Sequence, residues 1–172
     1  MIATHVQRAL AAAGTGLCLS MALHSPVADA ATQRTINLSA TSVCEAPLPV
    51  FNVHLRKRPV AVQNESDSPV FVTCTLPTDN AGHSNTGTVE VTFASFDGAV
   101  STIGCTMVSG TRGAQVFYVP GEVLLPASGR VALVWENVNK WTSGMYAFSC
   151  NLPPGVAMET ITYTQTDTGG RV

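Results

Sequence analysis

Two segments with the same pattern around a cysteine constrain the fold of this chain most strongly. They span residues 70–77 and 146–153, and each has apolar side chains at every second position and ends in Cys, any residue, Leu and Pro. Period-two alternation places the apolar side chains and the cysteine on one face of a β-strand. Proline ends such a strand because it has no N–H to donate to the ladder. We therefore predict two core strands that carry cysteines into the interior.

The first 30 residues have the layout of a secretory signal peptide. Arg8 precedes an apolar stretch at residues 9–23, and Ala28-Asp29-Ala30 supplies a cleavage site between small residues. The apolar stretch is too short and too interrupted for a membrane span of about 20 residues. We expect cleavage near Ala30, a secreted or periplasmic location, no membrane span in the mature chain, and one domain at residues 31–172.

Four cysteines lie beyond that segment: Cys44, Cys74, Cys105 and Cys150. An even number of cysteines in an exported chain indicates two disulfides, with three possible pairings. Because Cys74 and Cys150 hold equivalent positions in the repeated pattern, we expect each to have its own upstream partner, which favours Cys44–Cys74 and Cys105–Cys150. A zinc site is the competing use, but the sequence has no CxxC spacing, so we expect no metal ligand among them.

The charge balance gives no reason to expect a polyanionic partner. Removing Arg8 and Asp29 from the nine basic and eleven acidic residues leaves the net charge at −2. We therefore predict no nucleic-acid binding. The only basic run is Arg56-Lys57-Arg58, followed by a proline. It could steer an acidic partner, but three charges are few, and we interpret the run as protection of an edge strand.

The remaining pattern favours an all-β fold. Residues 88–93, 100–107, 130–135 and 158–165 alternate, and Asp97-Gly98, Pro120-Gly121 and a polar stretch at 136–144 are interpreted as turns or loops. No window has a sustained apolar period of 3.6 residues, so little helix is expected. About ten short strands at turn-punctuated intervals predict an antiparallel β-sandwich, jelly-roll or immunoglobulin-like, with two disulfides.

Three elements together resemble those of small exported bacterial proteins of unassigned function. They are the turn Asn64-Glu65-Ser66, the strand and its continuation at 70–79, and the aromatic-x-Cys-x-Leu-Pro-Pro segment at 148–154. The resemblance extends over residues 64–163 and depends on disulfide and turn residues. It implies a β-sandwich fold, and it implies no known site.

One candidate site is the polar stretch that contains Trp141. An exposed aromatic ring can stack on the C–H face of a sugar while the amides of Asn137 and Asn139 bond its hydroxyls, so this loop is a possible glycan contact. The second tryptophan, Trp135, shares a strand face with Val131 and Leu133 and is expected in the core.

A second group of polar residues comprises Asp79, His83 and Asp97. Asp79 and His83 are further candidate ligand contacts. A small carboxylate-based secreted hydrolase would use Asp79 and Asp97 about 5–10 Å apart, whereas the simpler interpretation is that these residues cap turns. The chain has no Gly-x-Ser-x-Gly elbow, no His-Glu-x-x-His and no phosphate loop, so no catalytic residue and no cofactor are assigned.

These observations favour a secreted structural or binding module without an evident catalytic site. Its partner would be a cell-surface glycan or a protein. Three alternatives are a glycan-binding domain that uses the Trp141 loop, the carboxylate-based hydrolase, and a pilus-like subunit that completes its sandwich with a neighbour's strand. The last requires an open groove in the core.

Overall fold

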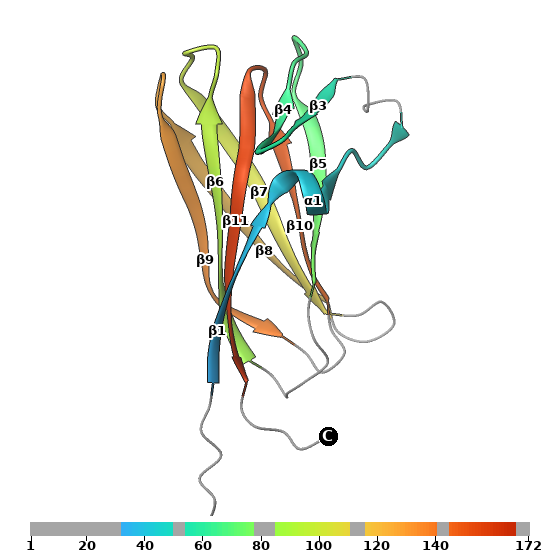
Figure 1. Cartoon of the computed structure of the whole chain (residues 1–172), viewed down its shortest axis with the longest axis vertical. Helices are drawn as coiled ribbons and strands as arrows, with labels where there is room; N and C mark the ends of the chain where they lie inside the picture. The colour runs from blue at the N-terminus through green and yellow to red at the C-terminus, as the bar shows by residue number, and fades with distance from the viewer. Residues whose placement is uncertain (1–31, 50–53, 78–84, 111–115, 141–144, 168–172) are drawn as a thin grey trace, which may run out of the picture.

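The computed structural model describes residues 32–49, 54–77, 85–110, 116–140 and 145–167 (Figure 1). These residues form eleven strands and one short helix, in the order β1 (Thr32–Ser39), α1 (Ala40–Val43), β2 (Cys44–Glu45), β3 (Leu55–Arg58), β4 (Ala61–Asn64), β5 (Val70–Leu76), β6 (Asn85–Ser95), β7 (Ser101–Gly110), β8 (Val116–Leu125), β9 (Arg130–Lys140), β10 (Met145–Leu152) and β11 (Val156–Asp167).

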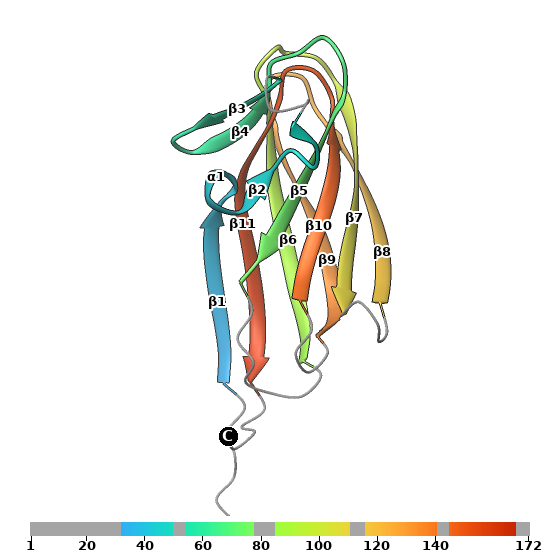
Figure 2. The ribbon, with the colours of Figure 1, turned by 90° about the vertical axis from the view of Figure 1, so that its right-hand side faces the viewer.

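The strands form two antiparallel sheets that face each other (Figures 1 and 2). Sheet A has the order β3-β4-β11-β6-β9, with β1 also paired to β11, and sheet B has the order β2-β5-β10-β7-β8. Between β4 and β7, and again between β8 and β11, each strand lies in the opposite sheet from the one before it. The predicted antiparallel β-sandwich is confirmed.

The two repeated cysteine strands, β5 and β10, lie side by side in sheet B. They pair antiparallel, with Phe148 opposite Cys74 and Cys150 opposite Val72. In both strands the predicted inward residues are buried, as the alternating burial of β5 illustrates. The alternation fixes which face is buried, because a shift of one residue would turn every apolar side chain outward.

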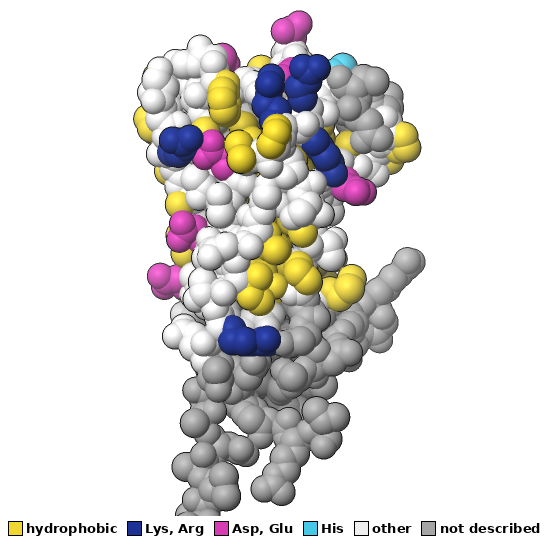
Figure 3. Space-filling view, in the orientation of Figure 1, with side chains coloured by type: hydrophobic (Ala, Val, Ile, Leu, Met, Phe, Trp, Pro, Cys, Tyr) yellow, Lys and Arg dark blue, Asp and Glu magenta, His cyan; other side chains and the backbone are white. Residues whose placement is uncertain are grey.

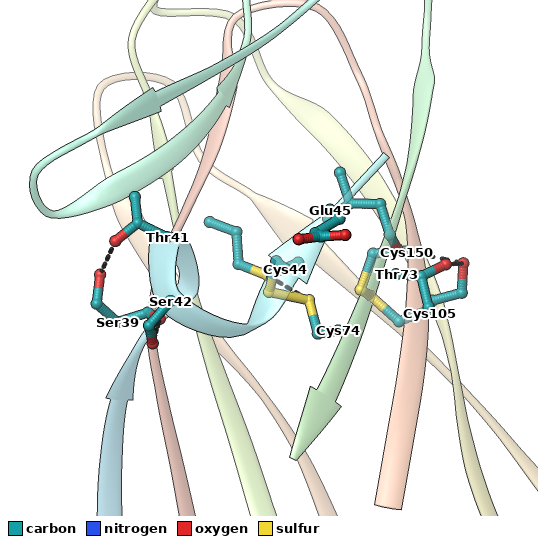
Figure 4. Close-up of a disulfide and its surroundings, with 12 residues drawn as sticks. Ser39, Thr41, Ser42, Cys44, Glu45, Thr73, Cys74, Cys105 and Cys150 are labelled. Carbon is teal, nitrogen blue, oxygen red and sulfur yellow. Dashed lines mark hydrogen bonds between the residues drawn. A yellow bond between two sulfur atoms is a disulfide. The ribbon is translucent and has the colours of Figure 1, made fainter. Parts of the chain in front are cut away.

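Both expected disulfides are present (Figure 4). Each joins directly opposed residues on neighbouring strands of sheet B, Cys44–Cys74 between β2 and β5, and Cys105–Cys150 between β7 and β10. All four cysteines point into the core, and Met158 of sheet A places its Sδ 3.7 and 3.6 Å from the sulfurs of Cys44 and Cys74. The disulfides therefore fix strand neighbours within sheet B.

Three details differ from the prediction. Asp97-Gly98 is not a hairpin turn, because the strands that it joins, β6 and β7, lie in different sheets. Pro120-Gly121 is not a turn either but lies inside β8. A proline is tolerated there because β8 is the edge strand of sheet B, so its missing N–H removes no inner ladder bond. The predicted loop at 136–144 begins later, because β9 continues to Lys140.

Gly121 allows β8 to pass close to Trp135 of β9. A side chain at Gly121 would place its Cβ 2.8 Å from Trp135 Nε1 and 3.1 Å from Leu133 Cδ1. Trp135 is 4% exposed and packs on Phe148 with ring centroids 5.8 Å apart, as the core assignment predicted. The glycine thus lets the edge of sheet B lie directly on the indole ring of sheet A.

A buried amide organises the end of the sandwich where β4 turns into β5. Asn64 is fully buried and donates from Nδ2 to the carbonyl oxygens of Ser68 (2.8 Å) and Leu152 (2.9 Å). Its Oδ1 accepts from the backbone N–H and the hydroxyl of Ser66, at 2.9 and 2.8 Å. The backbone carbonyl of Asn64 also accepts from Gly155 N–H. This one side chain therefore ties the β4–β5 turn to the end of β10.

The basic run lies on an edge strand, as predicted. Arg56, Lys57 and Arg58 make up most of β3, the outermost strand of sheet A, in a hairpin that projects from the body (Figure 2). Both arginines pair with Glu65, and Lys57 Nζ lies 3.9 Å from Glu45. Two carboxylates therefore partner the three cations of this strand.

The middle of the described sandwich is closely packed, and a depression of about 610 Å³ lies at one edge, between β2 and the β3–β4 hairpin. Inward residues from both sheets, including Val72, Met107 and Ile161, have no exposed surface. This packing counts against the pilus-like alternative. Among the described residues no helix has the length and apolarity to cross a membrane.

Candidate functional site

The outward face of sheet B carries a continuous polar surface with an apolar margin. Residues opposite one another in the strand register share a face, which defines the sheet B face by these side chains: Glu45 of β2; Phe71, Thr73 and Thr75 of β5; Met145, Ala147, Ser149 and Asn151 of β10; Thr102, Gly104, Thr106 and Val108 of β7; Tyr118, Pro120, Glu122 and Leu124 of β8.

One row of this face brings together four chemically different residues. In register across β5, β10, β7 and β8 lie Phe71, Asn151, Gly104 and Glu122. At the usual strand spacing the row is about 14 Å long. Phe71 is 53% exposed, so an aromatic ring stands at one end and a carboxylate at the other. Between them lie an amide and a residue without a side chain.

The centre of the row has an unoccupied acceptor beside open space. Asn151 Oδ1 is shielded from solvent and has no hydrogen-bond partner among the described residues. A Cβ built on Gly104 would meet no atom within 4 Å. A buried acceptor without a partner costs about 1–3 kcal/mol. The row therefore has an amide acceptor just beneath its surface that the described groups do not satisfy, beside open space above Gly104.

Hydroxyl groups form the next row. Thr73, Ser149 and Thr106 lie in register on β5, β10 and β7. Thr73 Oγ1 donates to Ser149 Oγ at 3.4 Å, and Ser149 Oγ donates to the carbonyl of Val72 at 3.2 Å (Figure 4). A hydroxyl carries one donor and two acceptor lone pairs. These groups thus keep hydrogen-bonding capacity for a ligand after bonding one another.

Two shallow depressions lie at opposite sides of the face. One, of about 460 Å³, is lined by Gly104, Thr106, Pro120 and Glu122 on β7 and β8. The other, of about 640 Å³, lies between the α1–β2 segment and β5 and includes Ser42, Glu45, Thr73 and Thr75. Ser149 and Asn151 of β10 lie on the strand between them. The surface is thus an open platform that crosses all five strands of the sheet.

The outward face of sheet A has a different character. Threonines there bond within the sheet, as Thr162 Oγ1 does to Asn37 Oδ1 at 2.8 Å. Arg130 of β9 makes a two-pronged ion pair with Glu159 of β11, which raises the pKa of the arginine. The space-filling view of Figure 3 shows basic and acidic side chains scattered together over the visible side. Several of its described polar side chains are therefore paired with each other.

The candidate residues taken from the sequence fall elsewhere. Asp79, His83 and Trp141 lie outside the described residues, so a contact through the Trp141 loop stays a prediction. Asn137 was expected in a loop, but it lies in β9, where it is exposed and has a φ of +55°. A register shift places the extra residue of a β-bulge there, and asparagine tolerates this left-handed conformation better than most residues. Asn139 also lies in β9, and its side chain is outside the described part.

Asp97 makes hydrogen bonds within the connection that follows β6. Its Oδ1 accepts from Ala99 N–H at 2.9 Å and from Ser95 Oγ at 3.0 Å, and these bonds lower the pKa of the carboxyl group. The carboxyl also lies over Gly155, whose φ of +70° requires a glycine. Asp79 lies outside the described residues, so its pairing with Asp97 stays a prediction. Within the described residues no three His, Cys, Asp or Glu side chains gather as metal ligands would.

Comparison with known proteins gives fold-level likeness only. No protein-family profile and no curated protein sequence matches this chain. Among solved structures, the Podospora anserina GH26-CBM35 β-(1,4)-mannanase superposes with a TM-score of 0.48 at 12% identity over 80% of this chain, which spans 28% of that one. The C-terminal CBM6 of the laminarinase LamC from Zobellia galactanivorans gives 0.47 at 16% identity, over 76% of this chain and 99% of that one.

A xylan-binding domain from CBM22 is also similar. Its TM-score is 0.42 at 13% identity, over 87% of this chain and 93% of that one. All three scores are below 0.5 and all three identities are below 25%.

Proposed function

We propose that this protein is a non-catalytic module that binds carbohydrate on the sheet B face. The observation that carries the proposal is the row of Phe71, Asn151, Gly104 and Glu122, with an unpartnered amide oxygen beside open space. We therefore expect glycan contact at this row of the sheet B face before the Trp141 loop.

The chemistry of the row matches that of a sugar ring. A pyranose has one face of C–H groups and a rim of hydroxyls, each of which can donate and accept. Phe71 supplies an exposed apolar ring for the C–H face. The Asn151 amide lies at the centre of the row, and the Glu122 carboxylate makes strong, charge-assisted bonds to sugar hydroxyls. Gly104 lets the ring approach the sheet.

The size of the surface favours an extended chain over a single sugar. The sheet B face crosses five strands, or about 19 Å at the usual spacing. Its two depressions lie on either side of β10 and neither is an enclosed cavity. We therefore expect affinity to rise with oligosaccharide length until the ligand spans both depressions.

The test is a substitution that blocks the row without harming the fold. In Gly104→Val, a side chain fills the open space between Asn151 and Glu122 and meets no protein atom at Cβ. We expect it to abolish binding in calorimetric titrations against soluble glucan, mannan, xylan and galactan. Because glycine weakens a strand interior by about 0.5–1 kcal/mol, the variant should be at least as stable as the natural chain. Asn151→Ala should weaken binding by about two- to tenfold, the worth of one hydrogen bond.

The control is Thr92→Val, which replaces a hydroxyl by a methyl group on the outward face of sheet A and leaves the sheet B face untouched. It should leave affinity unchanged. Failure of every polysaccharide to bind the natural chain would refute the proposal. So would binding that Gly104→Val leaves intact, because the ligand would then lie elsewhere.

We propose that the protein functions outside the cytoplasm. Two disulfides in a domain of this size are compatible with an extracellular location. We propose export after cleavage near Ala30, with a polysaccharide of the cell surface or surroundings as the partner. N-terminal sequencing of protein recovered from the exported fraction would test the cleavage position.

A further inference from the structure

The sheet B face has a one-sided distribution of charge. The sequences of its five strands contain no lysine and no arginine, whereas they contain two outward carboxylates, Glu45 and Glu122. The described basic residues are Arg34, Arg56, Lys57, Arg58 and Arg130, with Lys140 described in its backbone, and all belong to strands of sheet A. The candidate site therefore carries negative charge, and the strands of sheet B supply no lysine or arginine to neutralise it.

The two carboxylates are not equivalent. Glu45 lies at the edge of the face, with Lys57 Nζ 3.9 Å away. Glu122 is exposed at one end of the central row, beside Gly104, and forms no ion pair within the described part of the chain. The uncompensated negative charge therefore lies on the floor of the depression between β7 and β8.

We infer that the sheet B face selects its glycan by charge: it accepts neutral and amino-bearing polysaccharides and rejects polyanionic ones, and Glu122 determines that selection. This inference rests on the proposed function. A uronate or sulfated chain in the central row would bring like charges together without a cation to bridge them, which is destabilising. A protonated amino sugar in the same place would gain an ion pair with Glu122.

The experiment compares three probes by calorimetric titration in EDTA, which removes bridging divalent cations. They are the neutral polysaccharide that binds best, chitosan, and polygalacturonate. The natural chain should bind the neutral polymer more tightly than polygalacturonate. One exposed charge pair changes affinity by about 1.5- to fivefold, so Glu122→Gln should reduce chitosan affinity by that factor.

Charge reversal gives the sharper contrast. Glu122→Lys should lower chitosan affinity and raise polygalacturonate affinity, each by about 2- to 25-fold, and both changes should shrink as salt is raised because exposed charges are screened. The matched control is Glu90→Gln on the outward face of sheet A, which should leave the order of the three probes unchanged. The control removes the same charge from the same fold at a different place.

The outcomes separate this inference from the proposed function. If the natural chain binds no polymer at all, the proposed function fails and the charge rule fails with it. If it binds neutral polymers through Gly104 but binds polygalacturonate equally well, or if Glu122→Lys leaves the order of the probes unchanged, the charge rule alone is overturned.

Discussion

Replacing Cys105 and Cys150 together by alanine is expected to lower the free energy of unfolding by about 4 kcal/mol. The bridge closes a loop with a sequence separation of 45 residues, and the chain-entropy model assigns about 4.0 kcal/mol to a loop of that length. It also lies directly below the candidate site, because Gly104 precedes Cys105 and Asn151 follows Cys150. The measurement is chemical denaturation followed by tryptophan fluorescence.

The matched control is the other bridge. Its separation is 30 residues, so Cys44→Ala with Cys74→Ala should cost about 3.6 kcal/mol, slightly less. Only the first pair should also weaken glycan binding, because it holds β7 against β10 where the row crosses them. Loss of less than about 1 kcal/mol in both variants would contradict the account of sheet B as a sheet fixed by its disulfides.

Asn64→Ala is expected to destabilise the fold by about 3 kcal/mol. The substitution removes an amide that makes four hydrogen bonds, and it leaves the carbonyl of Leu152 without that partner in a buried position. An unsatisfied buried polar group costs about 1–3 kcal/mol, and the lost turn contacts add to this. Thermal or chemical unfolding would measure the change.

Asn151→Ala provides the comparison, since it is the same chemical change on the sheet B face. Asn151 Oδ1 has no partner among the described residues, so its removal breaks no described hydrogen bond of that atom and should not lower stability. The two variants should therefore separate cleanly, with Asn64→Ala unstable and competent to bind when folded, and Asn151→Ala stable and weak in binding. Equal stability losses would show that the Asn64 contacts do not hold the β4–β5 turn in place.

The fold could be predicted from the sequence because its main signals are local. Alternation in 70–76 and 146–152 identifies both the strands and their buried faces, and the repeated cysteines select the disulfide pairing. The edge position of the basic run follows from its composition. Pro120-Gly121 misled the prediction because a Pro-Gly pair usually marks a turn, whereas here the edge of a sheet tolerates the proline and a facing indole requires the glycine.

The candidate site could not be predicted in the same way. Phe71, Asn151, Gly104 and Glu122 come from four separate strands, and only the register of three strand pairs places them in one row. Threonine, serine and glycine on outward positions are typical of any exported β protein, so none of them indicates a site alone. One usable signal was present: Phe71 occupies an outward position in an otherwise regular core strand, where a polar residue is expected.

The most direct test of the central claim is a map of ligand contacts by NMR. The backbone amide resonances of the natural chain would be recorded during titration with the best-binding oligosaccharide. We predict that the largest chemical-shift changes fall on Gly104, Thr106, Ser149, Asn151 and Glu122. Changes confined to the segment around Trp141, with the resonances of β7 and β10 unmoved, would contradict the placement of the site on the outward face of sheet B.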